Sequence, residues 1–233
     1  MINFSQEELA TIYLSLKIAF AASICSLPFA IFLGYYFARK NFFLKKIFIS
    51  IINLPLVLPP VVTGYILLIT FGVNGVIGSF LLKHFNFTFA FKWTGAAFAC
   101  SIMGFPLMIR AIKLSIEMID KKYEQAARTL GASNLYVFFT ITLPLAFPGV
   151  VAGFTLSFAR ALGEFGATIT FVSNIPGETQ TLSTAIYTYL QIPEGELTAI
   201  RLTLISIFIS ISALLLSEYI FEKTLKYKKE ELE

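Results

Sequence analysis

Few residues of this sequence have the types and spacing that chemistry requires. His84 has no cysteine or second histidine near it, and Cys25 and Cys100 lie in apolar runs, so neither a metal site nor a disulfide is predicted. No glycine-rich phosphate loop followed by Lys and Ser or Thr occurs, so no nucleotide site is predicted. Arg160 and Glu164 lie four residues apart in an apolar segment, which predicts an ion pair on one helical face. The sequence therefore predicts no catalytic residue. It predicts one charged pair, Arg160 and Glu164, which helices must position.

The composition indicates that those helices cross a membrane. Of the 233 residues, 57% are hydrophobic and 14% are charged, and the mean hydropathy is +0.78. A water-soluble globular chain carries about a quarter charged residues, so a soluble enzyme is excluded. One span takes about 20 apolar residues, and five or six spans would use nearly all the hydrophobic residues. We predict an all-α polytopic membrane protein in which residues 1–233 form a single transmembrane domain.

Five apolar segments are long enough to span a bilayer, and two of them are not simple. The second contains Pro55, Pro59 and Pro60, which predict a helix broken beside a cavity or gate. The fourth continues to about residue 172. The stretch 73–92 is interrupted by glycines and charges, so it adds at most a sixth span or a re-entrant excursion. The segments are 10–38, 47–72, 93–109, 141–159 with its continuation, and 202–217.

Lysine and arginine predict which ends of the spans face the cytoplasm. Most of the 18 Lys and Arg residues lie in 39–46, in 110–140 and in the tail from 223 onwards, whereas 173–197 has none. Cytoplasmic loops are enriched in both residues, so five spans with the N-terminus outside and the C-terminus cytoplasmic fit this alternation. The net charge of +4 is then a signal of orientation in membrane lipid, and nucleic-acid binding is not expected.

The segment 119–135 is predicted to form a short amphipathic helix in the longest cytoplasmic stretch. Its apolar positions recur at helical spacing, Gly131 is suited to end the helix with a positive φ, and Ser133 is placed to cap another short helix. Spacing alone leaves two interpretations open. The segment is an ordinary helix on the membrane surface, or a helix that docks in a groove of a soluble partner.

The residues of this segment resemble the signature loop of ABC importer permeases. That loop reads Glu-Ala-Ala, three residues, Gly, nine residues, Ile, one residue, Leu-Pro, and 125–144 follows it with Gln125 in place of Glu. Glu124, one residue earlier, is the candidate to supply the missing acid. The resemblance implies a coupling helix seated in a cleft of a separate ATPase, which would bind ATP and Mg²⁺, so this chain would bind no cofactor. The residues carried over as ATPase-coupling are Glu124, Gln125, Ala126, Ala127, Arg128, Leu130 and Gly131.

Two further segments narrow the resemblance to molybdate permeases with the type I importer fold. Residues 54–65 and 161–179 look like theirs, whereas sulfate permeases are similar through 163–166 and diverge around 174–179. The resemblance implies import of molybdate across the bacterial inner membrane by a homodimer of this chain. Two cytoplasmic ATPase subunits and a periplasmic or lipid-anchored molybdate-binding protein would complete the complex. The alternatives are tungstate, sulfate or thiosulfate as substrate, or a non-transporting scaffold that docks a cytoplasmic protein.

A permease of this family must move a doubly charged oxyanion, which requires a water-filled route because an unpaired charge is prohibitive in a low-dielectric interior. On that interpretation Arg160 adds positive potential, and Glu164 limits how tightly the anion binds. Hydroxyl donors along the same wall would come from Ser157, Thr168 and Thr170. The favoured alternative is a structural ion pair that fixes helix packing, because charges in spans usually pair with each other.

Gly149 and Gly153 form a small-residue motif of the kind that brings two membrane helices into close contact. The motif is equally compatible with contact across a dimer and with packing inside one subunit. The sequence leaves these two interpretations open.

Overall fold

The computed structural model describes residues 5–230, and their side chains except at 221 and at 223–230. Every regular element in this part of the chain is a helix, and no strand occurs there. The elements in chain order are α1 (Gln6–Arg39), α2 (Lys45–Val57), α3 (Pro60–Phe71), α4 (Val76–Phe85), α5 (Trp93–Glu117), α6 (Lys121–Thr129), α7 (Asn134–Val137), the π-helix η1 (Phe138–Thr142), α8 (Leu143–Leu162), α9 (Gly166–Val172), α10 (Leu182–Tyr189) and α11 (Glu196–Glu230).

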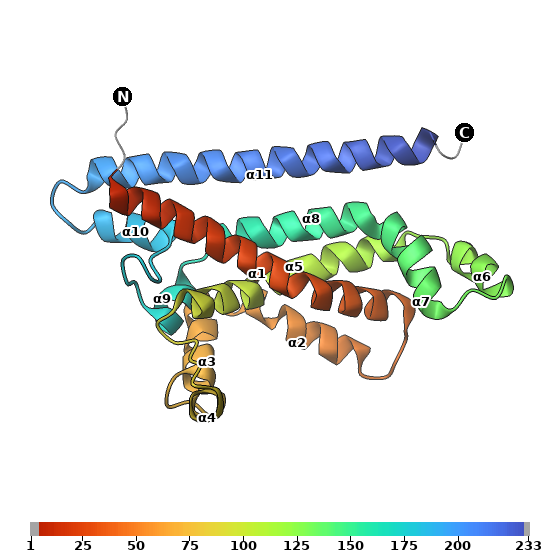
Figure 1. Ribbon diagram of the computed structural model, residues 1–233, viewed down its shortest axis with the longest axis horizontal. Helices are drawn as coiled ribbons and strands as arrows, with labels where there is room; N and C mark the ends of the chain where they lie inside the picture. Colours follow the sequence, from red (N-terminus) through yellow and green to blue (C-terminus); the bar gives the residue numbers. More distant parts are fainter. Residues whose placement is uncertain (1–4, 231–233) are drawn as a thin grey trace.

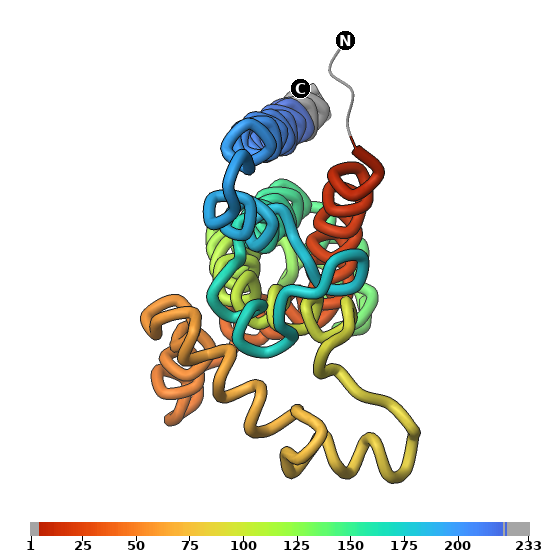
Figure 2. Tube along the Cα trace, turned by 90° about the vertical axis from the view of Figure 1, so that its left-hand side faces the viewer, coloured from red at the N-terminus to blue at the C-terminus, as the bar shows by residue number. Residues whose placement is uncertain are grey.

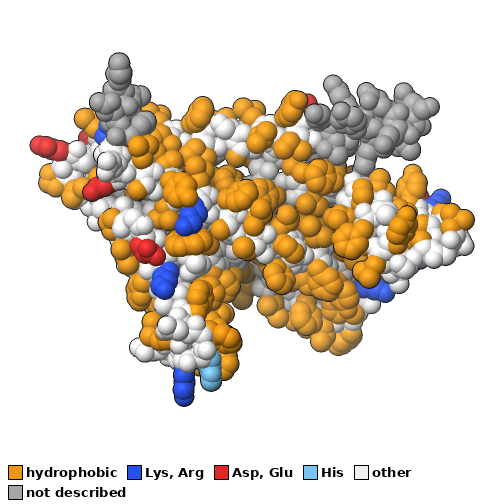
Figure 3. Space-filling model, in the orientation of Figure 1, with side chains coloured by type: hydrophobic (Ala, Val, Ile, Leu, Met, Phe, Trp, Pro, Cys, Tyr) orange, Lys and Arg blue, Asp and Glu red, His pale blue; other side chains and the backbone are white. Residues whose placement is uncertain are grey.

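The long helices α1, α5, α8 and α11 run along the molecule and form its body (Figure 1). The central helix is α5, which packs against α1 and α8, and α11 lies along α8. Four helical stretches are long and apolar enough to cross a membrane, and the bent pair α2–α3 makes a fifth if it counts as one span. Hydrophobic side chains cover most of the middle of the face in Figure 3, as a lipid-facing surface requires. The prediction of an all-α membrane protein is confirmed, with five spans when the bent pair is included.

The second span is broken, as its prolines predict. Helices α2 and α3 meet at an angle of 111°. Pro55 lies inside α2, Pro59 precedes α3, and Pro60 is the first residue of α3, where its missing N–H costs no helical hydrogen bond. The chain therefore turns at Pro59 and Pro60. Beyond this turn α3 and α4 project to one side of the bundle (Figure 2). With ten residues, α4 is too short to be a span, so 73–92 adds none.

Small residues allow the central helices to approach closely. A Cβ added at Gly153 would lie 2.9 Å from the Met108 carbonyl oxygen of α5, and one at Gly149 would meet the Ser115 side chain, also on α5. Gly104 of α5 is in the same kind of contact with Ser157 of α8. The small-residue motif of α8 therefore packs inside this subunit, which answers the question that the sequence left open.

The fourth apolar segment is not one continuous helix, contrary to the prediction. Helix α8 ends at Leu162, Gly163 caps it, and α9 begins at Gly166. At this turn the Glu164 carboxylate accepts a hydrogen bond from the backbone N–H of Ala167 at 2.8 Å, which satisfies one free N–H in the first turn of α9. Glu164 therefore lies in a break between two helices.

Candidate functional site

The predicted docking segment forms a short, well-capped helix. The Asp120 carboxylate accepts a hydrogen bond from the backbone N–H of Lys122 at 2.9 Å and so begins α6. After α6 ends, Gly131 has φ +87°, in the left-handed region that favours glycine. The Ser133 hydroxyl then caps α7 by accepting from the N–H of Tyr136 at 3.3 Å. The predicted turn at Gly131 and cap at Ser133 are confirmed, while the helix itself occupies 121–129 of the predicted segment 119–135.

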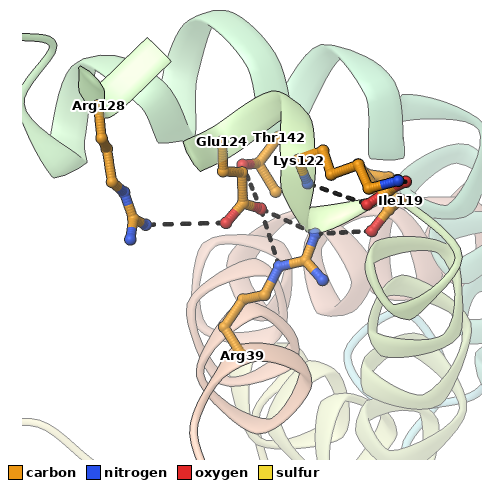
Figure 4. Close-up of polar contacts among 7 residues, drawn as sticks. Arg39, Ile119, Lys122, Glu124, Arg128 and Thr142 are labelled. Carbon is orange, nitrogen blue, oxygen red and sulfur yellow. Dashed lines mark hydrogen bonds and ion pairs between the residues drawn. The ribbon is translucent and has the colours of Figure 1, made fainter. Parts of the chain in front are cut away.

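The inner side of α6 is fixed by one buried carboxylate, Glu124, whose residue surface is 4% exposed (Figure 4). Its Oε1 accepts from Arg39 Nε at 2.8 Å and from the Thr142 hydroxyl at 3.0 Å, and Arg39 Nη2 lies 2.8 Å away. Its other oxygen lies 3.7 Å from Arg128 on the same helix. Arg39 also donates to the carbonyl oxygen of Ile119 at 3.2 Å, in the turn before α6. Glu124 thus ties α6 to the last residue of α1 and to the π-helix that leads into α8.

This geometry corrects the expectation that Glu124 supplies an acid to a partner. Its carboxylate points into its own subunit and is satisfied there. The next side chain, Gln125, is exposed and occupies the position where the family motif usually has Glu. The polar side chains that α6 leaves exposed beside it are Gln125 and the half-exposed Arg128.

The outer side of α6 and the turn after it expose apolar side chains at this end of the molecule. Leu130 is 88% exposed, and Tyr123 of α6 and Leu135 of α7 are also exposed. Ala126 is exposed as well, so a partner's surface can approach the helix backbone closely. Apolar side chains outside the apolar spans and next to charged ones are a typical docking surface.

The Arg160–Glu164 pair predicted from the sequence is confirmed, with 2.6 Å between Nη1 and Oε2. The Glu164 side chain is 1% exposed and the Arg160 side chain 27%. Because Glu164 also accepts from the N–H of Ala167 in the first turn of α9, the pair spans the turn between α8 and α9 instead of lying on one continuous helix.

The proline break and the turn after α8 lie against each other, which no sequence pattern predicted. A Cβ added at Gly166 would lie 2.8 Å from Pro60 Cβ, and one at Gly64 would lie 2.6 Å from the Ala167 carbonyl oxygen. Two glycines, one on each helix, thus let α3 pack closely on α9. The candidate gate residues Pro59 and Pro60 therefore adjoin the turn that carries Glu164.

The three predicted hydroxyl donors do not lie along one helical wall. Thr168 and Thr170, on α9, donate to the carbonyl oxygens of Phe165 and Gly166 within the same turn. Ser157, on α8, is fully buried against Gly104 of α5. Their role in a pathway stays a prediction. In the part of the chain that the structure describes, no group of three or more His, Cys, Asp or Glu could hold a metal ion.

Sequence reasoning missed Arg39 and Thr142 as partners of the docking helix. Arg39 was read as an orientation charge at the end of the first span, and Thr142 as a variable position in the motif. A signal was available for Arg39, because an arginine that ends a long apolar helix is well placed to bond to a cytoplasmic carboxylate. The carboxylate it bonds to could not be identified without the packing.

Comparisons with known proteins agree with these observations. The family described as "Binding-protein-dependent transport system inner membrane component" matches residues 26–226. The chain is 54% identical to the molybdenum transport system permease protein ModB of Haemophilus influenzae, over 94% of this chain and 96% of that protein. It is equally identical to ModB of Escherichia coli K12, over 91% and 93%. The sulfate transport system permease protein CysT of Salmonella typhimurium is 36% identical, over 76% of this chain and 64% of that protein.

Solved structures show the same fold at low sequence identity. A chain of the bacterial alginate ABC transporter, in complex with its alginate-bound periplasmic protein, has a TM-score of 0.74 at 17% identity, covering 93% of this chain and 78% of that chain. A chain of the MetNI methionine ABC transporter has a TM-score of 0.68 at 14% identity, covering 95% and 99%.

Proposed function

Because this chain belongs to the family of binding-protein-dependent transport system inner membrane components, we propose that it is the permease of an ATP-driven importer of molybdate. The observation that carries the substrate is 54% identity to molybdenum permeases over nearly the full length of both chains, against 36% to a sulfate permease over a shorter part. As a permease subunit, the chain is non-catalytic. Binding and hydrolysis of ATP with Mg²⁺ belong to a separate subunit.

The complex would contain two copies of this chain, two cytoplasmic ATPase subunits and a periplasmic or lipid-anchored molybdate-binding protein. The ATPase would receive α6 in a cleft, against the exposed side chains of Gln125, Leu130 and Tyr123. Glu124 would then pass the movement of α6 to α1 and α8, because its bonds reach both. The exposed outer side makes the contact, and the buried inner side transmits it.

The proposed orientation places the N-terminus outside and the C-terminus in the cytoplasm. Supporting this, α1 begins at the end of the bundle away from α6, and α11 ends at the same end as α6 (Figure 1). The abundance of Lys and Arg in 39–46 and 110–140 supports the same orientation.

The route of the anion would pass the contact between α3 and α9. The broken helix at Pro59 and Pro60 provides a place where packing can change without the loss of regular helical hydrogen bonds. Arg160 is partly exposed beside the turn after α8, so it can add positive potential there while Glu164 holds it.

The test is ATPase activity in proteoliposomes that contain this chain, its ATPase and its binding protein. Molybdate, tungstate, sulfate and thiosulfate are titrated separately. We expect stimulation by molybdate at the lowest concentration. Stimulation by sulfate or thiosulfate first would keep the permease and replace the substrate. An assembled complex that responds to none of the anions would favour the non-transporting scaffold.

A further inference from the structure

A pocket of about 230 Å³ lies between α2 and the second half of α5, the helix that precedes α6 in the chain. It is large enough for a tetrahedral oxyanion together with a few waters, at about 30 Å³ per water. Three polar side chains face it, Asn53 of α2 and Arg110 and Lys113 of α5. Among the described residues no carboxylate lines it, and the rest of the lining is apolar: Phe37, Ile49, Ile52, Pro106 and Ile109.

Arg110 differs from the other arginines of the long helices and from Lys17. Arg39, Arg160 and Arg201 each lie within 2.9 Å of a glutamate oxygen. Lys17 lies 3.8 Å above the centre of the Trp93 ring. Arg110 has neither a hydrogen bond nor an ion pair with any residue in the described part of the chain.

Arg110 lies inside a helix that is long and apolar enough to span a membrane, and this position bears on its charge. It lies seven residues before the last residue of α5, which is about 10 Å along the helix at 1.5 Å per residue. Arg110 is exposed in the single subunit and lies beside the apolar residues of the pocket. A guanidinium within an apolar span favours a nearby anion.

The two other polar groups can add to the binding of an anion. Lys113 lies 3.3 Å from Glu117, but both side chains are partly exposed and such a pair is weak, so the ammonium still contributes positive potential. The Asn53 amide donates to the Ile49 carbonyl oxygen of its own helix and keeps a second N–H. A planar guanidinium, an ammonium and an amide N–H together suit the oxygens of a tetrahedral anion.

We propose that this pocket of Asn53, Arg110 and Lys113 binds a tetrahedral oxyanion. One source of the anion rests on the proposed function: it is the transported molybdate on its way out to the cytoplasm. The same chemistry is present in the phosphate of an acidic phospholipid, since basic pockets between helices near the cytoplasmic surface hold such headgroups. Both ligands need the charge of Arg110.

The experiment measures binding of the two probes to the purified permease–ATPase complex. One arm is equilibrium dialysis with molybdate alone, in neutral detergent. The other arm is native mass spectrometry of the complex after exposure to vesicles of phosphatidylglycerol or, as the neutral lipid, phosphatidylcholine. The variants are Arg110→Gln and Lys113→Gln, and Lys83→Gln is the matched control because it removes an exposed lysine of α4.

Arg110→Gln is expected to weaken binding of one probe at least about tenfold, the size of a lost charged hydrogen bond. Lys113→Gln is expected to weaken binding of the same probe by a smaller factor. Loss of molybdate binding identifies the substrate as the ligand, and loss of phosphatidylglycerol alone identifies the lipid. Unchanged binding of both probes in Arg110→Gln and Lys113→Gln, relative to Lys83→Gln, overturns the proposal.

Two controls distinguish loss of anion binding from misassembly and from failure of the proposed function. If Arg110→Gln fails to assemble, Lys113→Gln and Arg110→Lys carry the comparison, and Arg110→Lys is expected to retain binding. A failure of the proposed function is seen independently, as a wild-type complex whose ATPase does not respond to molybdate. The phosphatidylglycerol arm can still succeed in that case.

Discussion

Glu124 and Glu164 are both buried and both pair with an arginine, yet they join very different parts of the chain. Glu124 is bonded to Arg39, which is 85 residues away, and so connects α6 with α1. Glu164 is bonded to Arg160 and to the N–H of Ala167, four and three residues away, and so stays within the turn after α8. Glu124 therefore joins α6 to other helices, whereas Glu164 fixes the shape of one turn. The same chemical group links distant helices in one place and sets local shape in the other.

The two sides of α6 extend this comparison. Glu124 is satisfied within the subunit, while Gln125, its neighbour in sequence, is exposed. Successive helical residues point about 100° apart, so adjacent residues can serve different faces. Replacing each of them tests whether contact and transmission are separable.

Glu124→Gln is expected to have the largest effect. It keeps the size of the side chain but leaves Arg39 buried without a countercharge, which costs about 3 kcal/mol of stability. The amide oxygen can still accept from Arg39, but the charged tie between α6 and α1 is lost, so molybdate uptake per ATP hydrolysed is expected to fall at least about tenfold. Uptake and ATP hydrolysis are measured together in proteoliposomes, and unfolding of the complex is followed by heating.

The control for Glu124→Gln is Gln125→Glu, which makes the reverse change on the exposed side and restores the residue usual in the family. It is expected to leave the uptake-to-hydrolysis ratio unchanged. Glu124→Asp, which keeps the charge, is expected to recover part of the ratio. A normal ratio in a folded Glu124→Gln complex would show that the tie to Arg39 carries no coupling.

Glu164→Gln is expected to have an intermediate effect of a different kind. The amide oxygen can still accept from Ala167, so only the charge opposite Arg160 is lost. Arg160 is partly exposed, and water compensates part of the loss, which leaves about 1–2 kcal/mol. Uptake and ATP hydrolysis are expected to decrease together, severalfold, with their ratio kept.

The matched control for this second variant is Glu194→Gln, at an exposed position of the loop before α11, which should behave as wild type. If Glu164→Gln lowered the ratio of uptake to ATP hydrolysis as much as Glu124→Gln, the two glutamates would not differ in role as argued above.

Gly131→Val is expected to have the smallest effect on the fold. At φ +87° a β-branched residue is strained by about 1–2 kcal/mol, and nothing lies within 4 Å of the added Cβ, so strain acts without a clash. Because Gly131 ends α6, the variant should weaken assembly with the ATPase while uptake per ATP in assembled complexes stays normal. Affinity for the ATPase is measured by titration, and Gly131→Asn, which tolerates positive φ, should be milder.

The sequence predicted those features that depend on composition or on residues close in the chain. Hydropathy identified the spans because each must bury about 20 consecutive residues in lipid. Proline chemistry identified the broken helix, and spacing identified the Arg160–Glu164 pair and the turn at Gly131. The error at the end of α8 came from reading an apolar run as a single helix, although Gly163 and a capping glutamate allowed a turn.

Only the tertiary structure decided which helices meet and through which side chains. The bond between Arg39 and Glu124 and the contact of Pro60 with Gly166 join elements distant in sequence. Whether Arg110 has a partner among the described residues also depends on such elements. A membrane helix is apolar on its lipid side as well as on its packed side, so hydrophobic periodicity does not indicate which face packs. The sequence therefore predicts local chemistry, but it does not predict which helices pack together.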